Sequence, residues 1–219
     1  MSGPPGDELP PWDHDEDLIS RARTLGQPRA RVVAWPPPGA PPVAIVVGRG
    51  GRSPAEVHLE AARADGVPIL RRRGGGCAVV LDPGNVVVSL AWPLPGVGGI
   101  TSAFALISAW VVDALDRCGA PGVVREGVSD LALAGRKIGG ACLWRTQGLV
   151  YYAATLLVAP DVELIERYLP HPPREPAWRG ARAHRAFLGR LGPLPVSTTA
   201  ADFAARLAAT LDPAALAQP

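Results

Sequence analysis

Lys137 is the clearest candidate in this chain for a side chain that takes part in chemistry. Of the 22 basic residues, 21 are arginine and Lys137 is the one lysine. A lysine ammonium is a compact point charge on a flexible stem, whereas an arginine guanidinium is a planar fork. Because arginine fills every other basic position, Lys137 is a candidate for a position that arginine cannot serve.

The neighbours of this lysine fit a site for acyl transfer. Residues 129–140 also hold a carboxylate, Asp130, and two glycines, Gly139 and Gly140, across an expected hairpin. Glycine lets a ligand come close to the backbone. A lysine in such a place can touch both an α-phosphate and an acyl carbonyl, and it can stabilise the charge that develops during acyl transfer. The alternative is a solvated hairpin tip.

A second cluster spans residues 71–85, where three arginines precede Gly74, Gly75 and Gly76. Backbone N–H groups of such a glycine segment can face an anion, and arginine supplies the cation for a phosphate or carboxylate. The spacing is neither that of a P-loop nor that of G-x-G-x-x-G. The cluster indicates an anion-binding loop of another kind, with a plain loop as the alternative.

The composition limits function and location. Charged residues make up 19% of the chain and the formal net charge is +2, which gives no electrostatic basis for binding nucleic acid or an anionic membrane. No apolar run approaches the roughly 20 residues that cross a bilayer, and the acidic, proline-rich start is unlike a signal peptide. Three cysteines without CxxC spacing argue against a disulfide framework or a zinc cluster. We expect a cytoplasmic protein without a protein-built metal site.

The candidate residues lie among expected strands and helices. Short apolar runs predict strands over residues 44–50, 67–73, 77–82 and 86–92, and three more between residues 123 and 158. Serine, proline and glutamate at 53–56 predict a helix that begins there and ends at Gly66. Further helices are expected over 18–25, 101–119, 161–169 and 198–211. Residues 170–187, rich in proline and arginine, are expected to form an ordered loop or a lid.

These elements interleave without the regular alternation of a doubly wound fold. We therefore expect an α+β domain with a mainly antiparallel sheet and helices packed on it. A chain of 219 residues that is 47% hydrophobic is long enough for one domain with a sizeable core. That domain is expected to cover residues 43–219, after a disordered or loosely packed segment over residues 1–42.

Three segments together resemble the lipoate-protein ligase family. Residues 71–85 (RRRGGGCAVVLDPGN) resemble its signature, in which two arginines are followed by glycines, Ala-Val, His-Asp and Gly-Asn. Residues 127–140 (GVSDLALAGRKIGG) resemble its Asn-Asp-Leu strand and its Lys-Val-Ser/Ala-Gly segment. Residues 46–60 (VVGRGGRSPAEVHLE) resemble its opening strand, Gly-Arg pair and glutamate-bearing helix. Order and spacing agree over residues 43–170.

The resemblance implies a class II aminoacyl-tRNA synthetase/biotin synthetase-like fold, shared with biotin protein ligases and octanoyltransferases, and a tunnel for an eight-carbon acyl chain. It implies that Lys137 is catalytic and bridges carbonyl and phosphate oxygens, and that Arg72 contacts the adenylate. Asp130 would help to place adenylate or magnesium. The other cofactor-binding positions that it implies are Gly75 and Gly76, near the acyl carbonyl, together with Asp82, Asn85, Ser129, Gly139 and Gly140.

Cofactors and partners follow from the same resemblance. In ligases of this family, ATP and lipoate give lipoyl-adenylate, and the acyl group then passes to a lysine of an acceptor domain. The resemblance thus implies ATP and Mg²⁺, lipoate or octanoate as the acid, and as acceptor a lipoyl carrier domain of a 2-oxoacid dehydrogenase or the glycine cleavage H protein. We expect the chain to lack the C-terminal accessory domain of some ligases, which a separate accessory subunit could supply.

Several positions depart from the family pattern and keep two alternatives open. One is an octanoyltransferase that takes octanoate from acyl carrier protein through a cysteine thioester; the family positions for that cysteine are not cysteine here, so Cys77 or Cys142 would have to serve. The other is a lipoyl- or acyl-binding homologue without catalysis. The departures are Cys77 for the third glycine, Leu81 for histidine, Ser129 for asparagine, and Ala153-Ala154 for His-Gly.

Overall fold

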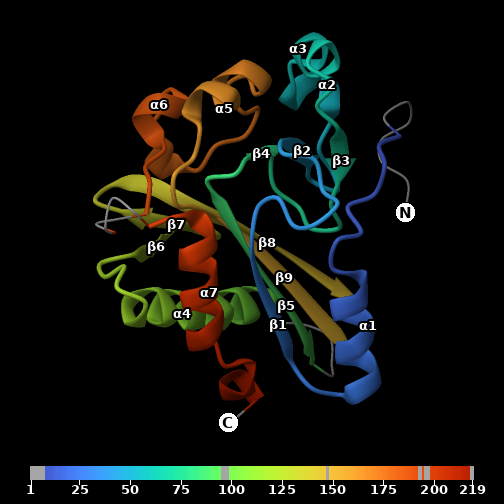
Figure 1. Ribbon diagram of the computed structural model, residues 1–219, viewed down its shortest axis with the longest axis vertical. Helices are drawn as coiled ribbons and strands as arrows, with labels where there is room; N and C mark the ends of the chain where they lie inside the picture. The colour runs from blue at the N-terminus through green and yellow to red at the C-terminus, as the bar shows by residue number, and fades with distance from the viewer. Residues whose placement is uncertain (1–7, 95–98, 147, 192–193, 195–197, 218–219) are drawn as a thin grey trace.

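A six-stranded sheet crosses the molecule, and a smaller three-stranded sheet lies beside one end of it (Figure 1). The computed structural model describes residues 8–94, 99–146, 148–191, 194 and 198–217. The main sheet has the order β1-β5-β9-β8-β7-β6, with every neighbouring pair antiparallel. Its strands are β1 (Arg29–Ala34), β5 (Asn85–Pro93), β6 (Val124–Glu126), β7 (Asp130–Leu133), β8 (Arg136–Thr146) and β9 (Leu149–Leu157).

The smaller sheet has the order β3-β2-β4, with β2 parallel to β3 and antiparallel to β4. These strands are β2 (Ala44–Val47), β3 (Ile69–Arg71) and β4 (Val79–Leu81). Both sheets together confirm the expected α+β domain with a mainly antiparallel sheet. The helices are α1 (Glu16–Leu25), α2 (Ser53–Glu56), α3 (Leu59–Ala64), α4 (Ile100–Arg117), α5 (Val162–Tyr168), η1 (Ala177–Arg179), α6 (His184–Phe187), α7 (Ala200–Thr210) and η2 (Pro213–Ala217).

The side chains of β9 alternate between the two faces of the main sheet, with a packed core on one face and a cavity on the other. Successive side chains of a strand point to opposite faces of the sheet. On one face, Tyr152, Leu156 and their neighbours on β5 pack against α4 and α7 in the largest core cluster. The other face of β9 carries Tyr151, Ala153, Thr155 and Leu157, which line a cavity. No helix within the described parts of the chain is long and apolar enough to cross a membrane.

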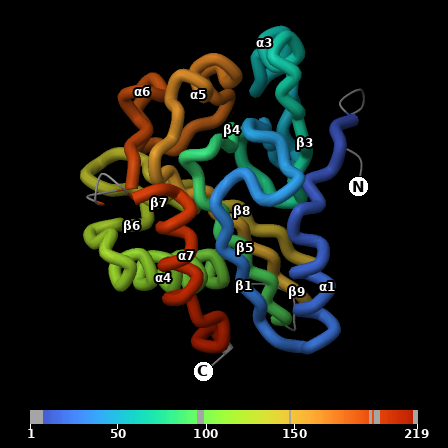
Figure 2. Tube along the Cα trace, viewed as in Figure 1, coloured from blue at the N-terminus to red at the C-terminus, as the bar shows by residue number. Residues whose placement is uncertain are grey.

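The N-terminal segment is more firmly built into the fold than we expected. We expected residues 1–42 to be disordered or loosely packed, yet β1 pairs with β5 along its whole length. Leu18, Ile19 and Ala22 of α1 are buried against the main sheet, because the apolar side of this helix covers the sheet where β9 begins. Figure 2 shows the chain passing β3 on its way into α1, where Trp12 N donates to the carbonyl of Arg71 over 2.8 Å.

Two further expectations need correction. The helix expected from residue 53 to Gly66 is two short helices, because Val57 between them is extended, with φ −137° and ψ 135°. The three strands expected between residues 123 and 158 are four, because a short strand, β6, precedes the others. The hairpin expected around Lys137 is present, and its turn at Ala134 and Gly135 has φ values of 49° and 71°, as in a two-residue hairpin turn.

Candidate functional site

A cavity of about 460 Å³ lies between the cavity face of the main sheet, the smaller sheet and residues 170–188. We call residues 170–188 the covering segment. The lining of the cavity includes apolar side chains such as Val46, Val79 and Val87, and also charged ones. The charged side chains on its lining are Glu56, Arg72, Asp130, Lys137, Arg174, Glu175 and Arg179. The cavity thus combines room for an apolar chain with a group of charges.

Lys137 and Asp130 meet on this lining, from neighbouring strands β8 and β7. Lys137 Nζ lies 2.6 Å from Asp130 Oδ1, and Asp130 Oδ2 accepts a hydrogen bond of 3.2 Å from Trp178 Nε1. A Cβ on Gly140 would come within 3.0 Å of Lys137 Nζ. The bare backbone of Gly140 therefore makes room for the ammonium, and the carboxylate fixes where it points.

Arg72 is used to build the glycine segment. Its Nη1 donates to the carbonyl of Val46 over 2.8 Å, and its Nη2 donates to those of Gly75 at 2.7 Å and Cys77 at 2.8 Å. The guanidinium lines the cavity, but most of its donors are turned to backbone carbonyls. In this conformation Arg72 holds the loop in shape, and its contact with an adenylate remains a proposal.

Glu56 secures the same loop from the other side. Its Oε2 accepts a hydrogen bond of 2.6 Å from the backbone N–H of Ala78, and the side chain is buried. Helix α2 has no side-chain cap, so the glutamate that indicated a helix start in the sequence binds the loop instead. The backbones of Gly48 and Gly76 are also in close contact, since a Cβ on Gly48 would lie 1.9 Å from the carbonyl oxygen of Gly76. Arg72, Glu56 and the backbone of Gly48 therefore all hold the glycine segment in place.

Asp82 and Asn85 do not lie on the cavity lining. Asp82 Oδ1 accepts from the N–H of Gly84 at 2.6 Å, and Oδ2 accepts from Asn85 Nδ2 at 3.1 Å and from the N–H of Asp161 at 3.3 Å. Burial raises the pKa of the Asp82 carboxyl. The pair fixes the turn between β4 and β5 and ties it to the start of α5, so this part of the motif has a structural explanation.

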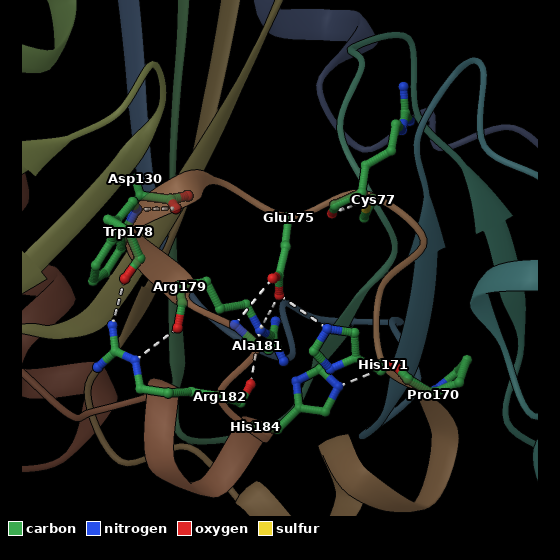
Figure 3. A network of polar contacts seen from close by, with 11 residues as sticks. Cys77, Asp130, Pro170, His171, Glu175, Trp178, Arg179, Ala181, Arg182 and His184 are labelled. Carbon is green, nitrogen blue, oxygen red and sulfur yellow. Dashed lines mark hydrogen bonds and ion pairs between the residues drawn. The ribbon is translucent and has the colours of Figure 1, made fainter.

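The covering segment is organised around Glu175 (Figure 3). Glu175 Oε2 lies 2.9 Å from His171 Nε2 and 3.3 Å from Arg179 Nε, and Oε1 accepts a hydrogen bond of 3.0 Å from the N–H of Ala181. Arg182 donates to the carbonyl of Gly135 on the hairpin turn over 3.0 Å. The expected lid is thus ordered and attached to the strand pair that carries Lys137.

Arg179 is the functional candidate that the sequence did not reveal. Its side chain is only 5% exposed, it lines the cavity, and its Nη2 has no hydrogen-bond partner among the described residues. Burial lowers the pKa of this guanidinium. A buried polar group without a partner is costly, so Nη2 is suited to an anionic oxygen of a ligand. No periodicity marks Arg179, which is one of four arginines in the covering segment.

Two cysteines also reach the cavity. Cys142 is buried, and burial raises the pKa of its thiol. Cys77 is partly exposed, and its Sγ lies 3.4 Å from the carbonyl oxygen of Arg174 in the covering segment. Between these two, Cys77 is therefore the more accessible thiol.

The structure brings most of the candidate residues to one cavity and leaves three out. Gly75, Asp82 and Asn85 are off the lining, and the Gly75 carbonyl binds Arg72. Among the positions that depart from the family pattern, Ala154 faces the core on the other side of the main sheet. The others, Cys77, Leu81, Ser129 and Ala153, line the cavity. The candidates on the lining are Arg72, Gly76, Ser129, Asp130, Lys137, Gly139 and Gly140.

Comparison with known proteins shows which sequences the chain is similar to. Residues 11–212 match the family described as the lipoyl protein ligase A/B catalytic domain. A lipoate–protein ligase of Streptococcus pyogenes is 29% identical over 147 residues, which cover 67% of this chain and 42% of that protein. The octanoyltransferase LipM of Kyrpidia tusciae is 28% identical over 233 residues, which cover 91% of this chain and 82% of that protein.

A solved structure shares the fold. It is described as a bi-partite lipoate protein ligase and its E2 lipoyl domain from Thermoplasma acidophilum, and it matches with a TM-score of 0.70 at 22% identity, over 96% of this chain and 80% of that one. This likeness confirms the expected fold. The chain spans less than half the length of the first curated ligases that it matches.

Proposed function

The chain belongs to the lipoyl protein ligase A/B catalytic domain family, and on that premise we propose that it is an ATP-dependent ligase for lipoate or octanoate. The carboxylate of the acid attacks the α-phosphate of ATP and releases pyrophosphate. The amine of an acceptor lysine then attacks the carbonyl of the acyl-adenylate and releases AMP. The product is an amide on a lipoyl carrier domain.

The position of Lys137 carries this proposal. Its ammonium is held 2.6 Å from Asp130 at the cavity lining, where a carbonyl or phosphate oxygen can approach it. A cation fixed in advance stabilises negative charge as it develops, without the cost of reorganising at that moment. Asp130 is held in turn by Trp178, so Asp130 and Trp178 act as positioning residues for the lysine.

Arg179 supports the anionic part of the ligand. Arg179 and Lys137 line the same cavity, and the Arg179 Nη2 is buried without a hydrogen-bond partner among the described residues. An arginine nitrogen of this kind favours a phosphate or carboxylate oxygen. The apolar lining by Val46, Val79 and Val87 supports binding of the acyl chain, since burying methylene groups is favourable. The two kinds of lining match the two ends of an acyl-adenylate.

We propose that Mg²⁺, when bound, is held mainly by the phosphates of ATP. Over the described residues, no group of three or more His, Cys, Asp or Glu side chains could hold a metal. Mg²⁺ is commonly bound by one or two carboxylates together with substrate phosphates, and Asp130 is the cavity carboxylate that fits this role. When bound, the ion would neutralise phosphate charge.

The acceptor in this proposal is a lipoyl carrier domain of a 2-oxoacid dehydrogenase or the glycine cleavage H protein, in the cytoplasm. The solved protein of similar fold is described as a bi-partite ligase with an E2 lipoyl domain. By analogy, we propose that the chain acts together with a separate accessory subunit.

Octanoyl transfer from acyl carrier protein is the second candidate. It is favoured by the match to LipM, which extends over 82% of that protein, and by Cys77 on the cavity lining. The Cys77 thiolate would attack the carrier thioester and release the carrier thiol. The acceptor lysine would then attack the new thioester, form the amide and release the Cys77 thiol.

One experiment separates the two candidates. The protein is incubated with a lipoyl carrier domain and either octanoate, ATP and Mg²⁺, or octanoyl carrier protein without ATP, and the acceptor is weighed by intact-mass spectrometry. The proposal predicts octanoylated acceptor only in the first mixture, and equally with Cys77→Ala. Octanoylation only in the second mixture, lost in Cys77→Ala together with an acyl-cysteine on the protein, would favour the transferase.

A further inference from the structure

The carboxylate of Glu175 connects a cation of the cavity to a turn of the covering segment (Figure 3). Its Oε2 lies 3.3 Å from Arg179 Nε and 2.9 Å from His171 Nε2, and its Oε1 accepts a hydrogen bond of 3.0 Å from the N–H of Ala181. Glu175 and Arg179 both line the cavity. A carboxylate is therefore built in beside the arginine that the cavity offers to an anion.

The guanidinium of Arg179 is fixed at one nitrogen and along one face. Its Nε donates to the carbonyl of Arg182 over 2.9 Å besides its contact with Glu175, and its Cζ lies 4.8 Å from the centroid of the Phe187 ring. The guanidinium is a planar fork, so fixing Nε and the plane also fixes the direction of Nη2. That nitrogen is buried without a hydrogen-bond partner among the described residues.

The turn that follows Arg179 depends on the same carboxylate. Gly180 and Ala181 have φ values of 58° and 57°, and alanine is unfavourable in this left-handed region because its Cβ crowds the following carbonyl. The bond from the Ala181 N–H to Glu175 helps to hold this conformation. The turn brings the Arg182 carbonyl to Arg179 Nε. Glu175 therefore acts on Arg179 directly and also through the turn.

Lys137 is held by other contacts. Its ammonium pairs with Asp130, and Asp130 accepts a hydrogen bond from Trp178. Loss of the Glu175 carboxylate should therefore disturb Arg179 more than the lysine. Anion affinity should change more than the rate of the chemical step, whereas a collapse of the whole covering segment would change both.

Charge alone would give Glu175 the opposite effect on an anion. A negative charge beside the site repels an anionic ligand, so removing that charge without moving Arg179 would strengthen binding. Removing a carboxylate that directs Arg179 would weaken binding. The sign of the change in affinity therefore distinguishes the two roles.

We propose that Glu175 is a positioning residue for Arg179 and directs this guanidinium so that Nη2 can bind an anionic oxygen of the ligand. The identity of that ligand as ATP or an acyl-adenylate rests on the proposed function. The positioning itself rests on the contacts of Glu175 with Arg179 and with the turn at Gly180 and Ala181.

The test is a double-mutant cycle on anion binding. ATP without Mg²⁺ is titrated by calorimetry into wild type, Glu175→Gln, Arg179→Gln and the double variant, with circular dichroism to confirm folding. Glu175→Asp, which keeps the charge on a shorter side chain, takes the place of Glu175→Gln if that variant does not fold. Glu166→Gln is the matched control, because Glu166 contacts the side chain and the N–H of Arg185 in the same segment.

Arg179→Gln should raise the dissociation constant for ATP about tenfold or more, and the Glu175 variant should raise it roughly fivefold. The control should bind ATP as wild type does. The double variant should bind no more weakly than Arg179→Gln, because Glu175 acts through Arg179. In single-turnover adenylate formation at saturating ATP, the Glu175 variant should stay close to the wild-type rate.

Tighter or unchanged ATP binding in the Glu175 variant would overturn the proposal. So would a double variant weakened by the product of the two single effects, or a loss of rate at saturating ATP as large as that in Lys137→Ala. If wild type binds no ATP, the proposed function fails, and the same cycle with octanoate tests the positioning alone. The same pattern with octanoate would support it, and another pattern or no binding would overturn it.

Discussion

The ammonium of Lys137 and the carboxylate of Asp130 lie 2.6 Å apart on adjacent strands, at the lining of the main cavity. The lysine side chain is 27% exposed and the aspartate side chain 9%. The pair is therefore open enough to meet a ligand and closed enough to be held in one geometry.

Replacing Lys137 should remove catalysis with little effect on folding. Lys137→Ala and Lys137→Arg should each lower the rate of acyl-adenylate formation by about 10²–10³-fold, the arginine variant because a planar fork does not fit the space above Gly140. The measurement is single-turnover adenylate formation beside urea unfolding. Arg125→Ala, on a short edge strand, is the control. Near-wild-type activity in Lys137→Arg would show that any cation suffices here.

Arg179→Gln should weaken binding of the anionic substrate. The variant loses the charged Nη2 donor, and hydrogen bonds to charged groups contribute about 1.5–3 kcal/mol, so we expect the KM for ATP to rise about tenfold or more. The matched control is Arg185→Gln in the same segment, whose side chain is 63% exposed and pairs with Glu166. Equal KM values for the two variants would remove Arg179 from the binding site.

Two glycines of the loop region should respond differently to alanine. Gly48→Ala should cost about 1–3 kcal/mol of stability, because its Cβ would lie 1.9 Å from the Gly76 carbonyl oxygen. Gly75→Ala is the control, since a Cβ there meets nothing within 4 Å. The measurement is the free energy of unfolding of both variants in urea. A stable Gly48→Ala protein would mean that the loop can move away from β2 at little cost.

The free energy of unfolding of the protein should fall in mild acid because of His184 in the covering segment. Burial lowers the pKa of this histidine below its ordinary 6.5, so the unfolded chain takes up a proton at a higher pH than the folded protein does. The free energy of unfolding should therefore fall as the pH drops through 6.5 toward the folded pKa. Urea unfolding at several pH values should show a smaller fall in His184→Gln. An identical fall in both proteins would assign the effect to other groups.

The proximity of several candidate site residues was predictable because they are close in sequence. Lys137, Asp130 and Gly140 share one hairpin, so a local motif brings them together. Arg179 was not predictable, because its burial depends on Glu175, Arg182 and Phe187 in a segment without periodicity. Asp82 is the opposite case, a motif residue whose hydrogen bonds show a structural task.

The fold was predictable where apolar periodicity was strong and not where contacts are long-range. The strand at 86–92 and the helix near residues 101–119 are present as β5 and α4. The helix expected over residues 18–25 is present as α1, but strand β1 and the ordered path of residues 8–15 were missed, because proline and charge at the start indicate disorder. The stabilising partners of that segment lie far along the chain, as the bond from Tyr151 to Asp15 shows.

The most direct test of the central claim is ATP–pyrophosphate exchange. Purified protein is mixed with ATP, Mg²⁺, labelled pyrophosphate and either lipoate or octanoate, with Lys137→Ala alongside. The proposed function predicts label in ATP that depends on the acid and disappears in the variant. No exchange with either acid, from a protein that octanoylates a lipoyl domain from octanoyl carrier protein, would contradict it.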